Sequence, residues 1–128
     1  MAFRNDTTIT DKVIPWCKSG DAALTTDASS LPFYCHKALT VVGVRALVAT
    51  APTGAVLYAD LHKDGVTMFT TQANRPHIHI GATDSGSWTV PDVTAVAAGS
   101  ILTVNIDAIG STLPGTQLTV EVRVRERL

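Results

Sequence analysis

The clearest pattern in the chain is a strict alternation of apolar and polar residues over Gln117–Arg125. The apolar members are Leu118, Val120, Val122 and Val124, and the polar members between them are Thr119, Glu121, Arg123 and Arg125. A period of two puts one set on a buried face and the other in water, which is typical of an antiparallel sheet. Ile101–Ile109 repeats the alternation, so we expect two half-buried strands in this part of the chain.

Turn signals divide the middle of the chain into further predicted strands. Asp64-Gly65 is a strong hairpin signal, and it separates the predicted strands Ala55–His62 and Val66–Thr71. Thr40–Thr50 is rich in valine, and Gly43 within it indicates a bulge or a close approach of the backbone. Shorter extended segments are expected at His77–Ile80 and Trp88–Pro91.

These segments add up to about seven or eight strands, and no long window shows the 3.6-residue period of a helix. Short strands with closely spaced turns favour a sandwich or a jelly roll. We therefore predict an all-β fold, an antiparallel β-sandwich (jelly-roll-like) formed by residues 33–128. Residues 1–32 mix Thr, Asp, Ser, Pro and Gly with little period, so we expect them to form an extended N-terminal arm that carries short strands.

The composition narrows the range of functions. The 128 residues suit one domain, and the net charge of −1 argues against a surface built to neutralise nucleic-acid phosphates. No stretch approaches 18 consecutive apolar residues, so we expect no membrane partner. The first residues lack the apolar core of a secretory signal, so we expect synthesis in a cytoplasm.

Two cysteines, Cys17 and Cys35, leave two interpretations open. They are either two reduced and partly buried thiols or a single bridge that closes the N-terminal region. His36 follows Cys35, but this spacing matches no common zinc pattern.

His77 and His79 form the one arrangement that looks like a pair of metal ligands, because residues two apart share a face of a strand. Asp60, His62, Asp64 and Asp84 are further candidates nearby. The pair resembles the first part of a cupin motif, but no Glu precedes Glu121 and no His follows His79. A metal enzyme needs three or more placed ligands, so two solvent-facing or interface histidines are the alternative.

Other catalytic arrangements have equally little support. Cys35 and His36 are neighbours in sequence, so in a strand they point to opposite faces. Asp60 and Asp64 flank the predicted hairpin turn, where acidic residues normally face solvent or cap the turn. We therefore expect no enzyme: no catalytic residue, no cofactor and no metal.

Binding to carbohydrate is a stronger alternative, because sugar sites use exposed aromatic rings together with polar loops. The aromatic candidates are Trp16, Trp88, Tyr34 and Tyr58, although aromatic residues make up only 5% of the chain. For either tryptophan, core packing or an interface is favoured over a sugar platform. The residues that we expect at an interface are Trp16, Trp88, His77, His79, Arg123 and Arg125.

One long region contains a set of distinctive short sequence motifs. They are VGVRA and APTGA, then KDG and MFTTQANRP, then VPDVTAVAAGS, and they lie within Val41–Arg125. This region, about two-thirds of the chain, resembles a domain of virion proteins from tailed bacteriophages, particularly those of actinobacteria. That domain occurs in minor tail or fibre-like proteins and in short stand-alone virion proteins.

The resemblance implies a structural or adhesive role on a virion. Because the chain is short and has no fibre repeats, we expect a capsid decoration protein that binds the major capsid protein on the outer capsid surface. We expect a homo-oligomer, with a trimer as the working hypothesis. The alternative is a tail-fibre or receptor-binding module that recognises a glycan of the host surface.

Overall fold

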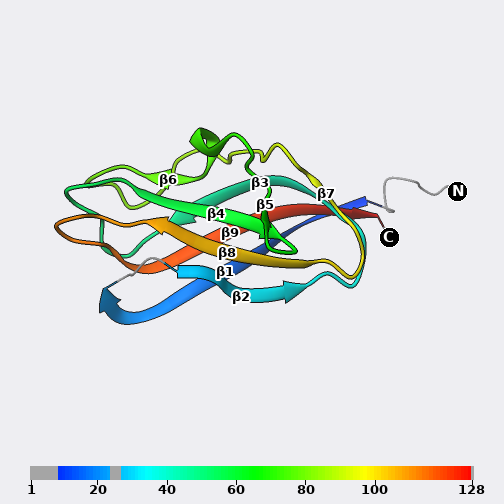
Figure 1. Ribbon diagram of the computed structural model, residues 1–128, viewed down its shortest axis with the longest axis horizontal. Helices are drawn as coiled ribbons and strands as arrows, with labels where there is room; N and C mark the ends of the chain where they lie inside the picture. Colours follow the sequence, from blue (N-terminus) through cyan, green and yellow to red (C-terminus); the bar gives the residue numbers. More distant parts are fainter. Residues whose placement is uncertain (1–8, 24–26, 128) are drawn as a thin grey trace, which may run out of the picture.

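The computed structural model describes residues 9–23 and 27–127, which form two antiparallel sheets packed face to face (Figure 1). In the first sheet the strand order is β1 (Ile9–Ala23), β9 (Thr116–Arg127), β3 (Leu39–Leu47) and β7 (Ala95–Val96). In the second sheet it is β2 (Asp27–Tyr34), β8 (Ile101–Ala108), β4 (Leu57–Lys63) and β5 (Val66–Thr67), and β6 (His77–Ile78) also pairs with β4. A short 3-10 helix, η2, spans Gln72–Asn74, and the described residues contain no α-helix. The prediction of an all-β antiparallel sandwich is confirmed.

The core lies between the two sheets and follows the alternation in the sequence. Leu118, Val120, Val122 and Val124 of β9 are each at most 2% exposed. They face Leu57, Ala59 and Leu61 of β4, which are fully buried. Burying one such aliphatic side chain contributes about 1.5–3 kcal/mol to the stability of the fold. The apolar residues that predict the strands therefore also stabilise the packing of the two sheets.

The described part of residues 1–32 forms edge strands of the sandwich. β1 is 15 residues long and pairs with β9 from Ile9 to Lys18, while β2 pairs with β8 and continues past residue 32 to Tyr34. The sequence led us to expect an extended arm with short strands, whereas β1 and β2 are long and belong to the two sheets. Pro15 and Pro32 suit these positions, because an edge strand can lack a donor on its outer side. Residues 1–8 and 24–26 of the predicted arm lie outside the described residues.

The opposite edge of the first sheet is covered by the chain between residues 83 and 96. This segment runs antiparallel to β3, with isolated bridges from Leu47 to Asp84 and from Val44 to Thr89, and it ends in β7. The predicted strands Val66–Thr71 and His77–Ile80 are shortened to two residues each, in β5 and β6. Beyond β5 the chain turns toward the core. Met68 and Phe69 there are fully buried, and they cover this side of the core.

Both predicted backbone irregularities are present. Asp64 and Gly65 have positive φ values of 51° and 83°, as the two-residue turn between β4 and β5 requires. The register between β3 and β9 shifts between Val41 and Gly43, which places a bulge at the predicted glycine.

Candidate functional site

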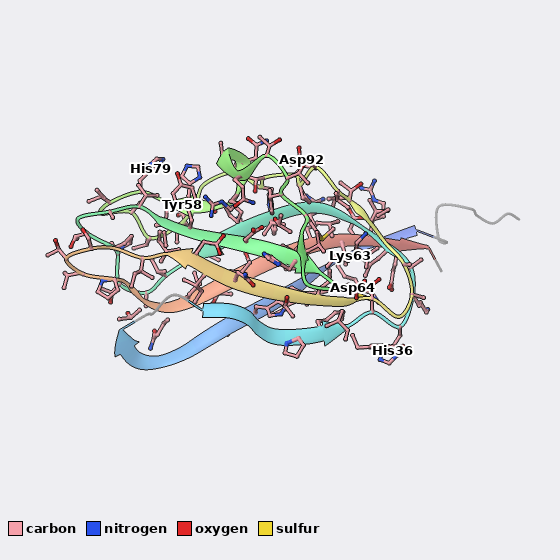
Figure 2. The ribbon with its side chains drawn as sticks, in the orientation of Figure 1. His36, Tyr58, Lys63, Asp64, His79 and Asp92 are labelled. Carbon is pink, nitrogen blue, oxygen red and sulfur yellow. The ribbon has the colours of Figure 1, made fainter. Side chains whose placement is uncertain are left out.

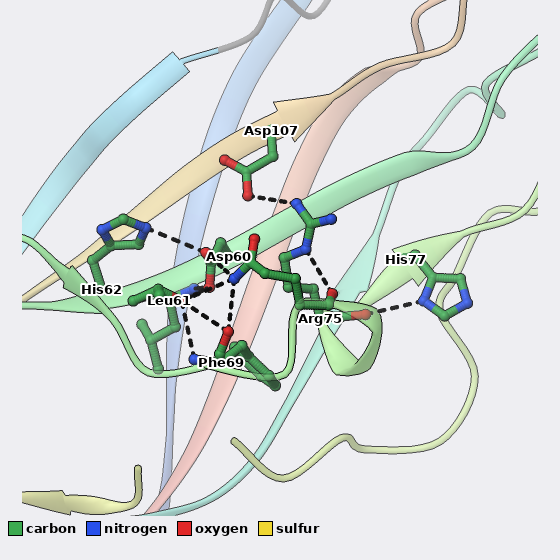
Figure 3. Close-up of polar contacts among 9 residues, drawn as sticks. Asp60, Leu61, His62, Phe69, Arg75, His77 and Asp107 are labelled. Atoms are coloured by element: carbon green, nitrogen blue, oxygen red, sulfur yellow. Dashed lines mark hydrogen bonds and ion pairs between the residues drawn. The ribbon is translucent and has the colours of Figure 1, made fainter. Parts of the chain in front are cut away.

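The outer side of the second sheet carries a buried carboxylate. Asp60 on β4 is only 2% exposed, and its Oδ1 accepts hydrogen bonds from the Leu61 backbone N–H and the Thr67 hydroxyl, both at 2.8 Å. Its Oδ2 lies 3.3 Å from His62 Nε2 and 3.4 Å from the Gln72 amide nitrogen (Figure 3). Asp60 is thus buried and hydrogen-bonded, where the sequence led us to expect a carboxylate that faces solvent or caps the turn.

The Asp60 network joins consecutive parts of the chain. Thr67 also accepts from the Phe69 N–H at 3.0 Å, and the Gln72 amide donates to the Phe69 carbonyl at 2.7 Å. The Asp60 carboxylate therefore helps to fix the segment that follows β5 to β4, together with the backbone hydrogen bond from the Met68 N–H to the Leu61 carbonyl at 2.8 Å. Because protein donors surround both oxygens of Asp60, we assign this network to the stability of the fold.

A second cluster follows along the same side of the sheet. The Arg75 guanidinium stacks on the Tyr58 ring, 4.5 Å from its centroid, and donates to Asp107 at 2.8 Å. The His77 ring lies 5.2 Å from Tyr58 and 4.9 Å from His79, measured between centroids. Figure 2 shows His79 at the outer surface with Tyr58 nearby. The structure thus brings the two predicted histidines together and adds Tyr58, Arg75 and Asp107.

A hollow of about 320 Å³ borders this cluster. Its lining is formed by Ala73, Asn74, His77, Thr89 and Val90. The two chain segments that supply this lining are joined just outside it. Asp92 accepts hydrogen bonds from the Thr71 N–H at 2.7 Å and from the Thr71 hydroxyl at 3.0 Å. The backbone hydrogen bond from Thr71 is the main cause that lowers the pKa of Asp92.

The outer face of the first sheet carries the other predicted interface residues. Trp88 packs over Gly43 on this face, and the Arg45 guanidinium lies 4.7 Å from the centroid of the Trp88 ring. The Nε of Arg45 also donates to Glu121 at 2.6 Å. In the register of β3 and β9, Gly43 is opposite Arg123, so Trp88, Arg45 and Arg123 are neighbours.

Asp11 on β1 forms ion pairs with two arginines at one end of the same face. It accepts from Arg125 Nε at 2.7 Å and from Arg125 Nη2 at 3.1 Å, and Arg123 Nη2 lies 3.3 Å away. The hydrogen bond from Arg125 is the largest cause that lowers the pKa of Asp11. We call the surface formed by Arg45, Trp88, Arg123 and Arg125 the arginine face.

The remaining candidates lie elsewhere. Trp16 is 4% exposed and packs edge-on against Phe33 at 6.0 Å, so it belongs to the core. Cys17 and Cys35 are both free, which agrees with the interpretation as two thiols. Cys35 is buried and its neighbour His36 is exposed, as expected for adjacent residues in an extended chain. Tyr34 is half exposed and packs edge-to-face against His36.

The predicted metal candidates do not converge. Asp64 accepts from the Ile101 N–H at the hairpin turn, and Asp84 accepts from the Gly86 N–H in its own loop. Within residues 9–23 and 27–127, no group of three or more His, Cys, Asp or Glu side chains is placed to hold a metal ion.

Sequence reasoning missed Arg45, Arg75 and Asp107. Arg75 lies in an Asn-Arg-Pro segment that reads only as a break between strands, and Asp107 reads only as the polar member of an alternating pair. The contact of Arg75 with Asp107 joins positions 32 residues apart and that of Arg45 with Glu121 joins positions 76 apart, so a single sequence offers no local signal for either.

Comparisons of the chain with protein-family models, with curated proteins and with solved structures found no match. In the described part of the chain, no helix has the length and apolar character needed to cross a membrane.

Proposed function

We propose that this chain is a structural protein of a bacteriophage virion, a capsid decoration protein that docks through its arginine face. The observation that carries this proposal is the gathering of Trp88, Arg45, Arg123 and Arg125 on one face of the first sheet. Tryptophan and arginine are the residue types most enriched at the energetic centres of protein interfaces.

Three further features of the arginine face suit a protein partner. Val13 on the adjacent strand β1 is 48% exposed, which adds apolar area beside the guanidinium groups. Arg45 and Arg125 are already held by Glu121 and Asp11, so little side-chain entropy is lost when a partner binds. The sheet beneath them is a rigid support, as an interface with a preformed surface requires.

The phage resemblance of Val41–Arg125 gives this surface its proposed partner, the major capsid protein. We propose a homotrimer as the bound form, because a capsid offers symmetric positions for a small oligomer. Many copies on one shell would then hold it through combined weak contacts.

Binding of the purified chain to shells that lack it tests the proposal. We expect Val13→Asp combined with Arg123→Glu to lower the affinity by roughly tenfold or more, because both changes lie on the arginine face. The matched control is Val66→Asp on the β4–β5 hairpin, where Val66 is 66% exposed, and it should bind as the unchanged chain does. Full binding by the double variant, or absence of the chain from purified virions, would overturn the proposal.

Truncation of residues 1–32 is no test of docking. It would remove β1 and most of β2, which would expose Val120, Val122 and their neighbours on β9. Point substitutions on exposed side chains leave the sandwich intact, so they separate binding from folding.

The alternative is a receptor-binding module that recognises a host-surface glycan, and the hollow beside His77 favours it. Asn74 and His77 line it with an amide and an imidazole, and the Tyr58 ring lies beside His77 with the Arg75 guanidinium over it; these are groups that sugar sites use. Binding of the chain to host cell-wall polysaccharide, lost in Asn74→Ala but kept in the Val13 and Arg123 double variant, would favour this alternative over decoration.

A further inference from the structure

His77 and His79 flank a buried residue on β6, and their imidazole rings meet outside the sheet. Ile78 between them is fully buried, so the alternation of the strand directs both histidines outward. Their ring centroids are 4.9 Å apart and their planes are perpendicular. His79 is exposed, so the space beside the two rings is open to solvent.

One hydrogen bond determines which nitrogen of His77 is available. Nδ1 of His77 lies 3.0 Å from the backbone carbonyl of Arg75 (Figure 3). A carbonyl oxygen only accepts, so Nδ1 donates in this contact, and in the neutral ring Nε2 then carries the lone pair. A ring N–H bonded to a backbone carbonyl is the usual arrangement behind a histidine that binds a metal ion.

The distance between the rings fits a shared ion. Two imidazoles that bind one metal at about 2.0–2.1 Å with a tetrahedral angle hold their centroids about 5 Å apart. The centroids of His77 and His79 are already 4.9 Å apart. We propose that these two histidines bind one divalent transition-metal ion, of the Zn²⁺, Ni²⁺ or Cu²⁺ class, with its other coordination positions open.

The surroundings support such an ion. The Arg75 guanidinium also contacts Tyr58, but Asp107 balances its charge at 2.8 Å, and the guanidinium is turned onto the Tyr58 ring. The Tyr58 ring also packs on His77 at 5.2 Å, which restricts the imidazole to this orientation. Imidazole nitrogen is a preferred ligand of these metals.

The proposed site has fewer protein ligands than the site of a metal enzyme, which the sequence argues against. The chain supplies two ligands, so the ion keeps open positions that water or a donor from a second molecule can fill. The site is independent of the arginine face, because β6 belongs to the second sheet. The proposal therefore stands whether or not the chain decorates capsids.

Calorimetric titration with NiCl₂ tests the proposal, using the full chain with Cys17→Ser so that the exposed thiol does not compete. We expect one bound ion per chain, and an affinity lower by roughly tenfold or more in His79→Ala and in His77→Ala. Since His79 is exposed, His79→Ala keeps the fold, and an unchanged urea midpoint verifies this. His36→Ala removes an exposed histidine that packs edge-to-face against Tyr34, and it should leave binding unchanged.

A second readout follows the ligand atom itself. On addition of Zn²⁺, the ¹⁵N resonance of His77 Nε2 should shift, while Nδ1 keeps its proton. Equal nickel affinity in the His79→Ala chain and its parent, or loss of binding in His36→Ala, would overturn the proposal, as would a metal-induced shift at Nδ1 alone.

Discussion

The Trp88 indole lies directly over Gly43, where the backbone carries no side chain to hold it away. A Cβ at position 43 would stand 2.9 Å from Trp88 Cβ and 3.2 Å from Trp88 Cε3. The glycine therefore allows the loop between residues 83 and 96 to lie against β3. This contact links the bulge in β3 to the position of the main aromatic residue on the arginine face.

We predict that Gly43→Ala destabilises the fold by about 1–3 kcal/mol, as overpacking a tight contact does. Trp88 cannot simply rotate, because the clash involves its Cβ and the adjacent Thr89 is bonded to Val44. Urea unfolding measures the change. In a Trp88→Gly background, which removes both the Cβ and the indole, the same glycine substitution should cost less, and an equal cost in both backgrounds would show that Trp88 is not the cause.

We predict that Asp60→Ala lowers the free energy of unfolding by about 3 kcal/mol, because it removes the acceptor of the buried Leu61 N–H and leaves the Thr67 hydroxyl only its longer bond to the Phe69 carbonyl. Thr67→Val removes one arm of the network and should cost about half as much. Chemical denaturation of the purified variants provides both values.

Asp107→Ala is the matched control for Asp60. It removes a carboxylate from the same side of the sheet, but its side chain is 27% exposed and bonds mainly to Arg75. Its loss should cost no more than about 1 kcal/mol. A cost equal to that of Asp60→Ala would contradict the assignment of Asp60 as the central residue of the network.

We predict that Asp11 contributes to stability above about pH 4 and that this contribution is lost in more acid solution. Arg125 lowers the pKa of Asp11, so the folded chain holds the carboxylate ionised to lower pH than the unfolded chain does. The contribution is therefore complete above the ordinary aspartate pKa, and it disappears as the pH falls through the lowered value.

An NMR titration of the Asp11 carboxyl carbon checks this prediction. Arg125→Ala should raise the Asp11 pKa toward the ordinary value, and Arg123→Ala should raise it by less, since its hydrogen bond is the longer and weaker one. If Arg123→Ala has the larger effect, the pairing on this face differs from the one described.

We predict that an alkylating reagent modifies Cys17 in the folded chain and modifies Cys35 only after unfolding. Cys17 is exposed, whereas Cys35 is 1% exposed and burial raises the pKa of its thiol. A raised pKa leaves little of the reactive thiolate. Mass spectrometry of iodoacetamide-treated protein, with and without urea, gives the result. Modification of Cys35 at the same rate as Cys17 in the native state would show that the β2 end of the sandwich opens.

The sequence predicted those features that depend on residues close together in the chain. The alternation over Gln117–Arg125 determined the buried face of β9, since a strand has a strict period of two. Asp64-Gly65 determined the hairpin between β4 and β5, because a two-residue turn requires positive φ at both positions. Gly43 likewise marked the bulge in β3.

The candidate sites were only partly predictable. His77 and His79 share a face because they are two residues apart, and the sequence was enough to pair them. The contacts of Arg75 with Tyr58 and Asp107 were not predictable, because they depend on how the chain returns after β5.

Local alternation thus determined by itself that this chain forms a sandwich, and which faces of its central strands are buried. The tertiary structure alone decided that residues 9–23 pair along β9, that Asp60 is buried under the segment after β5, and that Trp88 reaches Gly43. The physical reason is that strand pairing and loop packing join residues far apart in the chain. Their choice of partner depends on the surface that the whole fold buries, and no short window of sequence records it.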